Sequence, residues 1–117
     1  MRLFACALMA VTLLYNGTAF GDDNPVVEGA DQLYRLCNYS DQPSKSACFG
    51  FIGGVFEVAA NNPIDGIRSC PPSLTNVLKA QRLTLKWIAA HPNKKLEPAS
   101  RAIAEALAEA FPCGKSK

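Results

Sequence analysis

The sequence predicts an all-α fold, a small helical bundle of about four main helices with two disulfides. Three observations predict it. Apolar residues recur at helical spacing in several segments, and the connections between these segments are short and rich in turn-forming residues. The cysteines are even in number once an N-terminal leader is set aside. A chain of 117 residues can form one small domain with a modest core.

Residues 1–21 have the layout of a secretory signal peptide. Arg2 gives a positive start, an apolar run extends from Leu3 to Tyr15, and small residues follow. The apolar run is too short for a comfortable membrane span. We therefore expect residues 22–117 to form one exported domain, with no membrane segment in the mature form.

The charge balance argues against a nucleic-acid partner. The chain carries 12 basic and 10 acidic residues, and a cleaved leader would remove only Arg2 among them. A near-neutral surface lacks the electrostatic footprint of a nucleic-acid-binding protein.

The first helix is predicted to begin with Asp31 as its N-cap. Its apolar stripe consists of Leu33, Leu36 and Cys37. The pattern fades after Cys37, and Pro43 marks a position by which this helix has ended. The polar residues 38–47 are predicted to form a displayed loop between two cysteines.

Residues 48–60 are almost wholly apolar, with Glu57 as the only charge. A short run of this kind could be a buried strand. A helix is favoured because Phe49, Ile52 and Phe56 align at helical spacing. Gly50 and Gly53 would then share a face along which a neighbouring helix can approach closely.

Residues 61–72 contain several turn signals and predict a loop, and residues 75–90 predict a third helix with Ser73 or Thr75 as its cap. One apolar face consists of Leu74, Val77, Leu78, Leu85 and Ile88, with Gln81 among them. The opposite face consists of Ala80, Leu83, Trp87 and Ala90. A basic stripe of Lys79, Arg82 and Lys86 lies between them. A helix with two apolar faces is packed on both sides, either inside the monomer or against another chain.

The last helix is predicted to begin with Glu97 as N-cap and Pro98 at the first helical position, and to end at Pro112. Its apolar stripe consists of Ile103, Leu107, Ala110 and Phe111. We expect Arg101, Glu105 and Glu109 to remain in solvent.

Short connections favour antiparallel neighbours, which places Cys37 and Cys48 at one end of the bundle and Cys70 and Cys113 at the other. Disulfide partners need Cα atoms within about 7 Å of each other. The predicted pairing is therefore Cys37–Cys48 and Cys70–Cys113. A zinc site is disfavoured because the sequence has no C-x-x-C motif and a single histidine.

The sequence offers little for catalysis. His91 precedes a proline at a helix end, where its ring can meet the negative helix terminus. Glu57 has no second carboxylate spaced to work with it, and no Gly-rich phosphate loop follows a strand. We expect neither an enzyme nor a cofactor or metal.

The segment from Leu33 to Cys113 resembles the Rap/Tai family of immunity proteins of bacterial type VI secretion systems. The matching pieces are Leu36-Cys37, C-F-G-F-I-G-G-V at 48–55 with Glu57, Cys70-Pro71, Thr75, W-I-A-A-H-P at 87–92 and A-L-A-E-A-F-P-C at 106–113. The chain departs from the family pattern at Ser73-Leu74, where Gly is more usual, and at Phe51, where Tyr is more usual.

The resemblance implies a small helical periplasmic protein, often a homodimer, that occludes the active site of a peptidoglycan-cleaving amidase toxin. The loops at one end of the bundle are the candidate toxin-binding surface. Its residues are Tyr39, Asp41, Ser44, Lys45, Ser46, Asn93, Lys94 and Lys95. The loop with Asp65, Ile67 and Arg68 is the reserve candidate.

Leu83 and Trp87 are the candidates for a dimer contact, with packing inside the monomer as the alternative for Trp87. The competing function is a small disulfide-bonded periplasmic chaperone or stress protein. Such a protein would bind many unfolded clients and expose apolar surface on acidification, for which a single histidine supplies little.

Overall fold

A computed structural model of the chain describes residues 27–114, so the predicted leader lies outside the described residues. The elements within this range are α1 (Ala30–Asn38), α2 (Gln42–Ala59), α3 (Val77–Ala90), the 3₁₀ turn η1 (Pro92–Lys94) and α4 (Ala99–Ala110). The prediction of an all-α fold with four main helices is confirmed.

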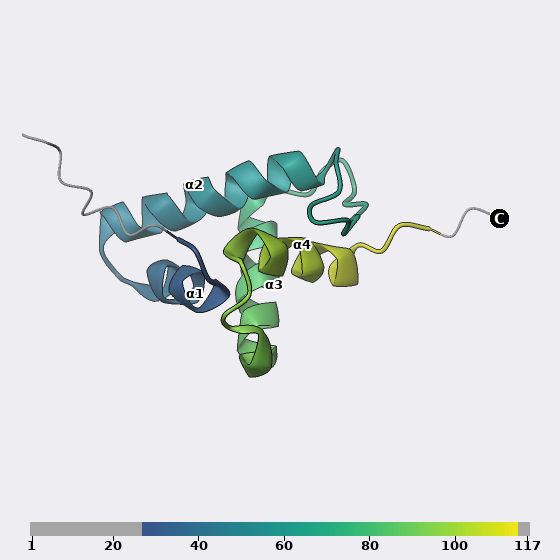
Figure 1. Cartoon of the computed structure of the whole chain (residues 1–117). Coiled ribbons are helices and arrows are strands. Elements are labelled where there is room, and N and C mark those ends of the chain that lie inside the picture. The colour runs from purple at the N-terminus through teal and green to yellow at the C-terminus, as the bar shows by residue number, and fades with distance from the viewer. Residues whose placement is uncertain (1–26, 115–117) are drawn as a thin grey trace, which may run out of the picture.

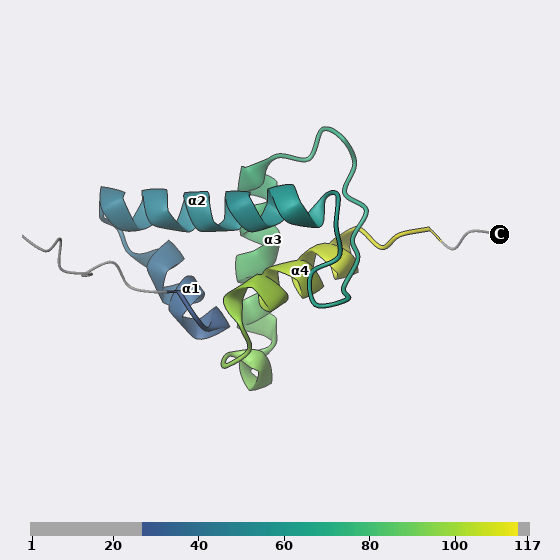
Figure 2. The same ribbon diagram turned by 45° about the horizontal axis from the view of Figure 1, so that its top comes forward.

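The helices do not run up and down side by side. Figures 1 and 2 show α3 crossing α2, whereas α1 and α4 lie on one side of α2. α3 packs on both α4 and α2, and α1 packs mainly on α2. The connection of residues 60–76 is long enough for α3 to cross α2 instead of returning alongside it.

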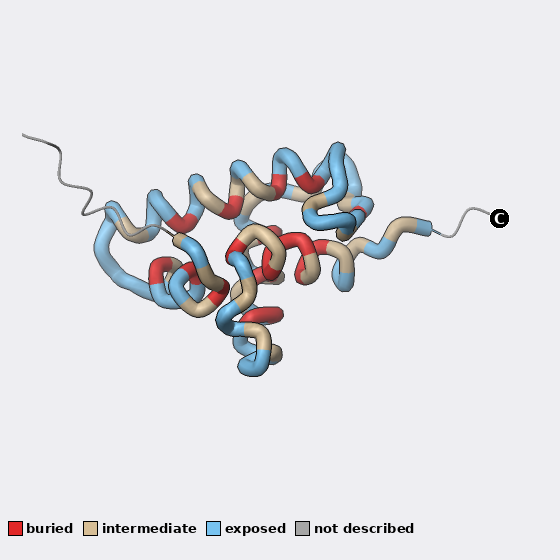
Figure 3. Tube along the Cα trace, in the orientation of Figure 1, coloured by how far each residue is buried: buried red, intermediate tan, exposed pale blue. Residues whose placement is uncertain are grey.

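α4 forms the centre of the core, as the run of buried positions along it in Figure 3 shows. Ile103 and Leu107 are completely buried, and the small side chains of Ala102 and Ala106 are buried beside them. Small residues let neighbouring helices approach closely, and the large ones fill the space between them. The core therefore forms where α4 meets the other three helices.

The start of α2 differs from the prediction. Asp41 is its N-cap, and the Asp41 Oδ1 atom accepts a hydrogen bond from the Ser44 backbone N–H at 2.9 Å. Pro43 lies in the first turn, where a missing N–H costs no helical hydrogen bond. Residues 42–47 are therefore helical, and the prediction that residues 38–47 form a displayed loop is wrong.

α1 also begins differently. Its N-cap is Gly29 rather than Asp31. The Gln32 Oε1 atom accepts hydrogen bonds from the backbone N–H groups of Glu28 and Gly29, at 2.8 Å and 3.3 Å. Asp31 instead pairs with Arg35 one turn later, at 3.5 Å.

The other two helix starts lie slightly later than predicted. Asn76 caps α3 by accepting from the Lys79 N–H at 2.9 Å, in place of Ser73 or Thr75. Pro98 is the N-cap of α4 and not its first helical residue.

Both predicted disulfides are confirmed. The Cα atoms of Cys37 and Cys48 lie 5.0 Å apart, and those of Cys70 and Cys113 lie 4.9 Å apart. The Cys70 backbone N–H also donates to the Phe111 carbonyl at 2.8 Å. The loop before α3 therefore runs beside the C-terminal end of α4, which gives the predicted pairing without a regular up-and-down bundle.

Two glycines of α2 were predicted to face a neighbouring helix, and one does. A Cβ added at Gly53 would lie 3.4 Å from Val77 Cγ1, whereas one at Gly50 would have nothing within 4 Å. Gly53 thus faces the start of α3 with room for a Cβ at ordinary contact distance, and Gly50 faces open space.

Candidate functional site

The predicted toxin-binding residues lie in two groups near opposite ends of α1. Tyr39 is the C-cap of α1, whereas the Lys95 carbonyl accepts from the Asp31 N–H at 2.9 Å, in its first turn. A helix of this length spans about 13 Å. The structure therefore does not bring residues 39–46 and residues 93–95 together in one continuous loop surface.

In the first group, Asp41 and Ser44 form the N-terminal cap of α2, and the other residues do not take part in that cap. The hydrogen bonds that Ser44 donates to the Asp41 carboxylate hold the pKa of Asp41 below its ordinary value. Tyr39 is exposed in the short link between α1 and α2. Lys45 and Ser46 lie farther along α2 and face a groove.

The groove that Lys45 and Ser46 face lies between α2 and α3 and has a volume of about 550 Å³. We call it the α2–α3 groove. Its lining residues are Cys37, Gln42, Lys45, Ser46, Phe49, Leu78 and Gln81. Four of them follow one helical stripe of α2, at i, i+3, i+4 and i+7 from Gln42. Phe49 is 45% exposed and Leu78 is 57% exposed, so the groove displays apolar surface to solvent.

Phe49, Leu78 and Gln81 of this groove were not among the predicted site residues. The apolar run around Phe49 indicates a core position, and the polar run before it resembles a loop. The helical stripe becomes visible only when α2 is extended back to Gln42, and the Asp-x-Pro pattern at residues 41–43 was the signal for that extension.

The second group is already engaged within the monomer. The Lys94 Nζ atom pairs with Glu105 Oε2 at 3.1 Å, and it lies 5.3 Å from the centroid of the Trp87 ring. Arg101 Nε lies 3.3 Å from carboxylate oxygens of both Glu97 and Glu105. These contacts hold η1 against α4.

The prediction that Glu105 stays in solvent is therefore wrong, because its side chain is only 15% exposed. Burial tends to raise the pKa of Glu105, but hydrogen bonds from Lys94 and Glu97 outweigh it and leave that pKa below its ordinary value. Burial raises the pKa of Glu97, and the neighbouring Glu105 carboxylate raises it further.

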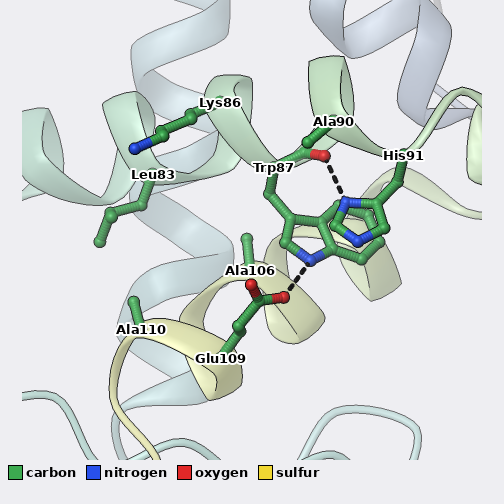
Figure 4. A pocket seen from close by; sticks show the side chains of 8 residues that line it. All are labelled: Leu83, Lys86, Trp87, Ala90, His91, Ala106, Glu109 and Ala110. Atoms are coloured by element: carbon green, nitrogen blue, oxygen red, sulfur yellow. Dashed lines mark hydrogen bonds between the residues drawn. The ribbon is translucent and has the colours of Figure 1, made fainter.

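Trp87 is buried between α3 and α4, as Figure 4 shows. Its Nε1 atom donates to Glu109 Oε2 at 2.9 Å, and its ring stacks on His91 with centroids 4.1 Å apart. The His91 Nδ1 atom lies 2.7 Å from the Trp87 carbonyl oxygen. Trp87 therefore packs inside the monomer and fixes the end of α3.

A hollow of about 260 Å³ lies beside this indole. Its lining residues are Leu83, Lys86, Trp87, Ala90, His91, Ala106, Glu109 and Ala110. Leu83 is half-buried on its wall. Leu83 and Trp87 thus lie together, at a surface where α3 meets α4.

The reserve loop is built around a tight turn. Asp65 and Gly66 have φ values of 49° and 77°, and Ile64 and Ile67 exchange backbone hydrogen bonds of 3.0 Å and 2.8 Å across them. Two positive φ values in a two-residue turn are typical of type I′. Ile67 is half-buried, while Asp65 and Arg68 are exposed.

Within residues 27–114, no group of three or more His, Cys, Asp or Glu side chains is placed to hold a metal ion. In the same range, no helix has the length and apolar character needed to span a membrane.

The family described as Rap1a immunity proteins matches residues 29–113. This range extends from the N-cap of α1 to the last disulfide cysteine, so it contains all four helices and both disulfides. No curated protein matches the chain, and no solved structure matches it.

Proposed function

The chain belongs to the Rap1a immunity protein family, and we propose that it binds and inhibits a peptidoglycan-cleaving amidase toxin of a type VI secretion system. The observation that carries this proposal is the family match over residues 29–113. The protein would act by covering the active-site cleft of the toxin, and not by catalysis.

We place this activity in the periplasm, after removal of residues 1–21. Two disulfides support this location, because structural disulfides form and persist in oxidising compartments. They also support a mechanism by occlusion. A scaffold held rigid before binding loses less conformational entropy when it fills a cleft.

The contacts to the toxin come from residues predicted at the two ends of α1. They are Tyr39, Asp41, Ser44, Lys45 and Ser46 at one end and Asn93, Lys94 and Lys95 at the other. Because Lys94 holds η1 against α4, its substitution would also disturb the monomer. The two groups therefore need separate variants.

The test uses residues 22–117 and a purified type VI peptidoglycan amidase from the same genome as its candidate partner. We expect one immunity protein per amidase to abolish peptidoglycan hydrolysis and the two proteins to co-elute. K45A/S46A and N93A/K95A then show which end of α1 contributes. A chain that leaves hydrolysis unchanged but suppresses the aggregation of unrelated unfolded proteins would replace this function with that of a chaperone.

We further propose that the protein is a homodimer whose contact includes Leu83 beside the indole of Trp87. A Leu83→Glu variant should elute as a monomer, with its mass measured by light scattering. A wild-type monomer at the same concentration would reject the dimer.

A further inference from the structure

The α2–α3 groove combines exposed apolar side chains with cations that form no ion pair within residues 27–114. Phe49 lies on the α2 wall and Leu78 on the α3 wall. Exposed apolar side chains that share a concave surface are typical of interaction sites. At about 550 Å³ the groove is also larger than the hollow beside Trp87, at about 260 Å³.

One basic side chain lines this groove, and a second lies beside it. Lys45 lines it directly, and Arg82 follows Gln81 and lies one turn after Leu78, on the same side of α3. In the part of the chain that the structure describes, neither cation is within an ion pair. α3 has three basic residues and no carboxylate, so its own sequence does not neutralise this wall.

Asp41, the residue before Gln42, carries a negative charge close to this groove. The Asp41 carboxylate caps α2 through Ser44. It also interacts electrostatically with Lys45 and offsets part of the positive charge of that lysine. Arg82 has no carboxylate on its own helix, so a partner with negative charge would complement this side of the groove.

The groove is formed before any partner arrives. Cys37 lines it and is bonded to the buried Cys48, which ties the end of α1 to α2. Gln42 Nε2 donates to Ser46 Oγ at 3.3 Å along the same wall. A surface held in this way needs little ordering when it binds.

We propose that this groove is the principal docking site for an acidic segment of the toxin. An apolar side chain of that segment would lie between Phe49 and Leu78, and carboxylates beside it would pair with Lys45 and Arg82. This inference rests on the proposed function and narrows it to one face of the molecule.

Two matched pairs of variants test the site. Leu78→Asp is compared with Leu96→Asp, because Leu96 is 81% exposed and lies outside the groove. Arg82→Glu is compared with Arg68→Glu, which reverses the same charge on the 61–72 loop. All four positions are exposed, and circular dichroism melting confirms that each variant folds.

Affinity for the candidate amidase is measured by calorimetry at two salt concentrations. We expect Leu78→Asp to weaken binding about 30-fold or more, as the loss of an interface hot spot does. Arg82→Glu should weaken it about 10-fold and reduce its salt dependence. Leu96→Asp and Arg68→Glu should stay within about twofold of the wild type.

The outcomes separate the two proposals. If the wild-type protein neither binds nor inhibits the amidase, the proposed function fails and this inference fails with it. If the wild type binds and Leu78→Asp matches Leu96→Asp, the groove is not the docking site, whereas the immunity function stands. If Leu78→Asp changes the oligomeric mass and not the amidase affinity, a second copy occupies the groove and the inference is overturned.

Discussion

The two ends of α1 differ in how their polar and charged side chains are used. At the junction of η1 and α4, Lys94, Arg101, Glu97 and Glu105 pair with one another inside the monomer. At the α2–α3 groove, a disulfide holds the backbone, and Lys45 forms no ion pair within residues 27–114. The first region uses its charges to hold the fold together. The second leaves them, together with exposed apolar groups, available to another molecule.

The largest expected effect comes from removing the covalent links. The loop closed by Cys70 and Cys113 spans 43 residues and that closed by Cys37 and Cys48 spans 11. Chain entropy predicts a loss of about 4 kcal/mol in unfolding free energy for C70A/C113A and about 3 kcal/mol for C37A/C48A. Urea unfolding measures both.

The same two variants sharpen the comparison in a binding assay. C37A/C48A should weaken amidase binding beyond its cost in stability, because Cys37 lines the groove. C70A/C113A should bind normally at temperatures where it is folded. Equal binding by the two variants would contradict a role for the first disulfide in shaping the groove.

Leucine truncation should separate core from surface. Leu107→Ala should lower the free energy of unfolding by about 3 kcal/mol, because a fully buried leucine leaves a cavity. Leu78→Ala should lower it by less than about 0.5 kcal/mol, because this side chain is largely exposed. Chemical denaturation of both variants tests the contrast, and a large loss for Leu78→Ala would show that the groove serves stability.

Trp87→Phe probes the polar contact that the indole makes between α3 and α4. The substitution removes the hydrogen bond from Nε1 to Glu109 while it keeps an aromatic ring near His91. We expect a loss of about 1 kcal/mol in unfolding free energy. Glu109→Gln retains an oxygen acceptor and should cost less, so thermal melting that ranks the two in the opposite order would reject this account.

The smallest effect is a pH dependence with two opposite signs. Because folding raises the pKa of Glu97, this group stabilises the fold at pH values below its ordinary pKa. The contribution is lost as the pH rises through the pKa of Glu97 in the folded protein. Because folding lowers the pKa of Glu105, this group stabilises the fold at pH values above its ordinary pKa. The contribution is lost as the pH falls through the pKa of Glu105 in the folded protein. Each effect should amount to about 1 kcal/mol or less.

Melting temperatures of Glu97→Gln and Glu105→Gln between pH 3 and pH 7 test these signs. The melting temperature of Glu97→Gln relative to the wild type should be higher at pH 7 than at pH 3. That of Glu105→Gln relative to the wild type should be higher at pH 3 than at pH 7. Parallel curves for both variants would mean that the two carboxylates do not differ in this way.

Local patterns were sufficient to predict the helices and the disulfide pairing. Periodic apolar residues identify each helix. The predicted antiparallel arrangement of α2 and α3 is wrong, but it leads to the right cysteine pairs. The boundaries were harder to predict, because Pro43 can either end a helix or occupy its first turn. Only the Asp41 cap distinguishes the two cases. The start of α1 at Gly29 depends on the Gln32 side chain, which accepts a hydrogen bond from the Gly29 N–H.

The candidate site was less predictable because it depends on contacts between distant residues. The indole of Trp87 meets a carboxylate 22 positions later in the chain, and no local pattern shows that this pair will bury the ring. Similarly, the local sequence around Lys94 is typical of an exposed loop and does not show that its partner Glu105 lies in the next helix. The groove required both the extended start of α2 and the crossing of α3.

The Cys70–Cys113 link also determines how the protein responds to cutting. It encloses α3, η1 and α4 in a single covalent ring. A protease that cleaves one peptide bond between these cysteines therefore opens the chain without separating its parts. The nicked protein would keep the mass of the intact chain plus one water, and would run as two fragments only after reduction.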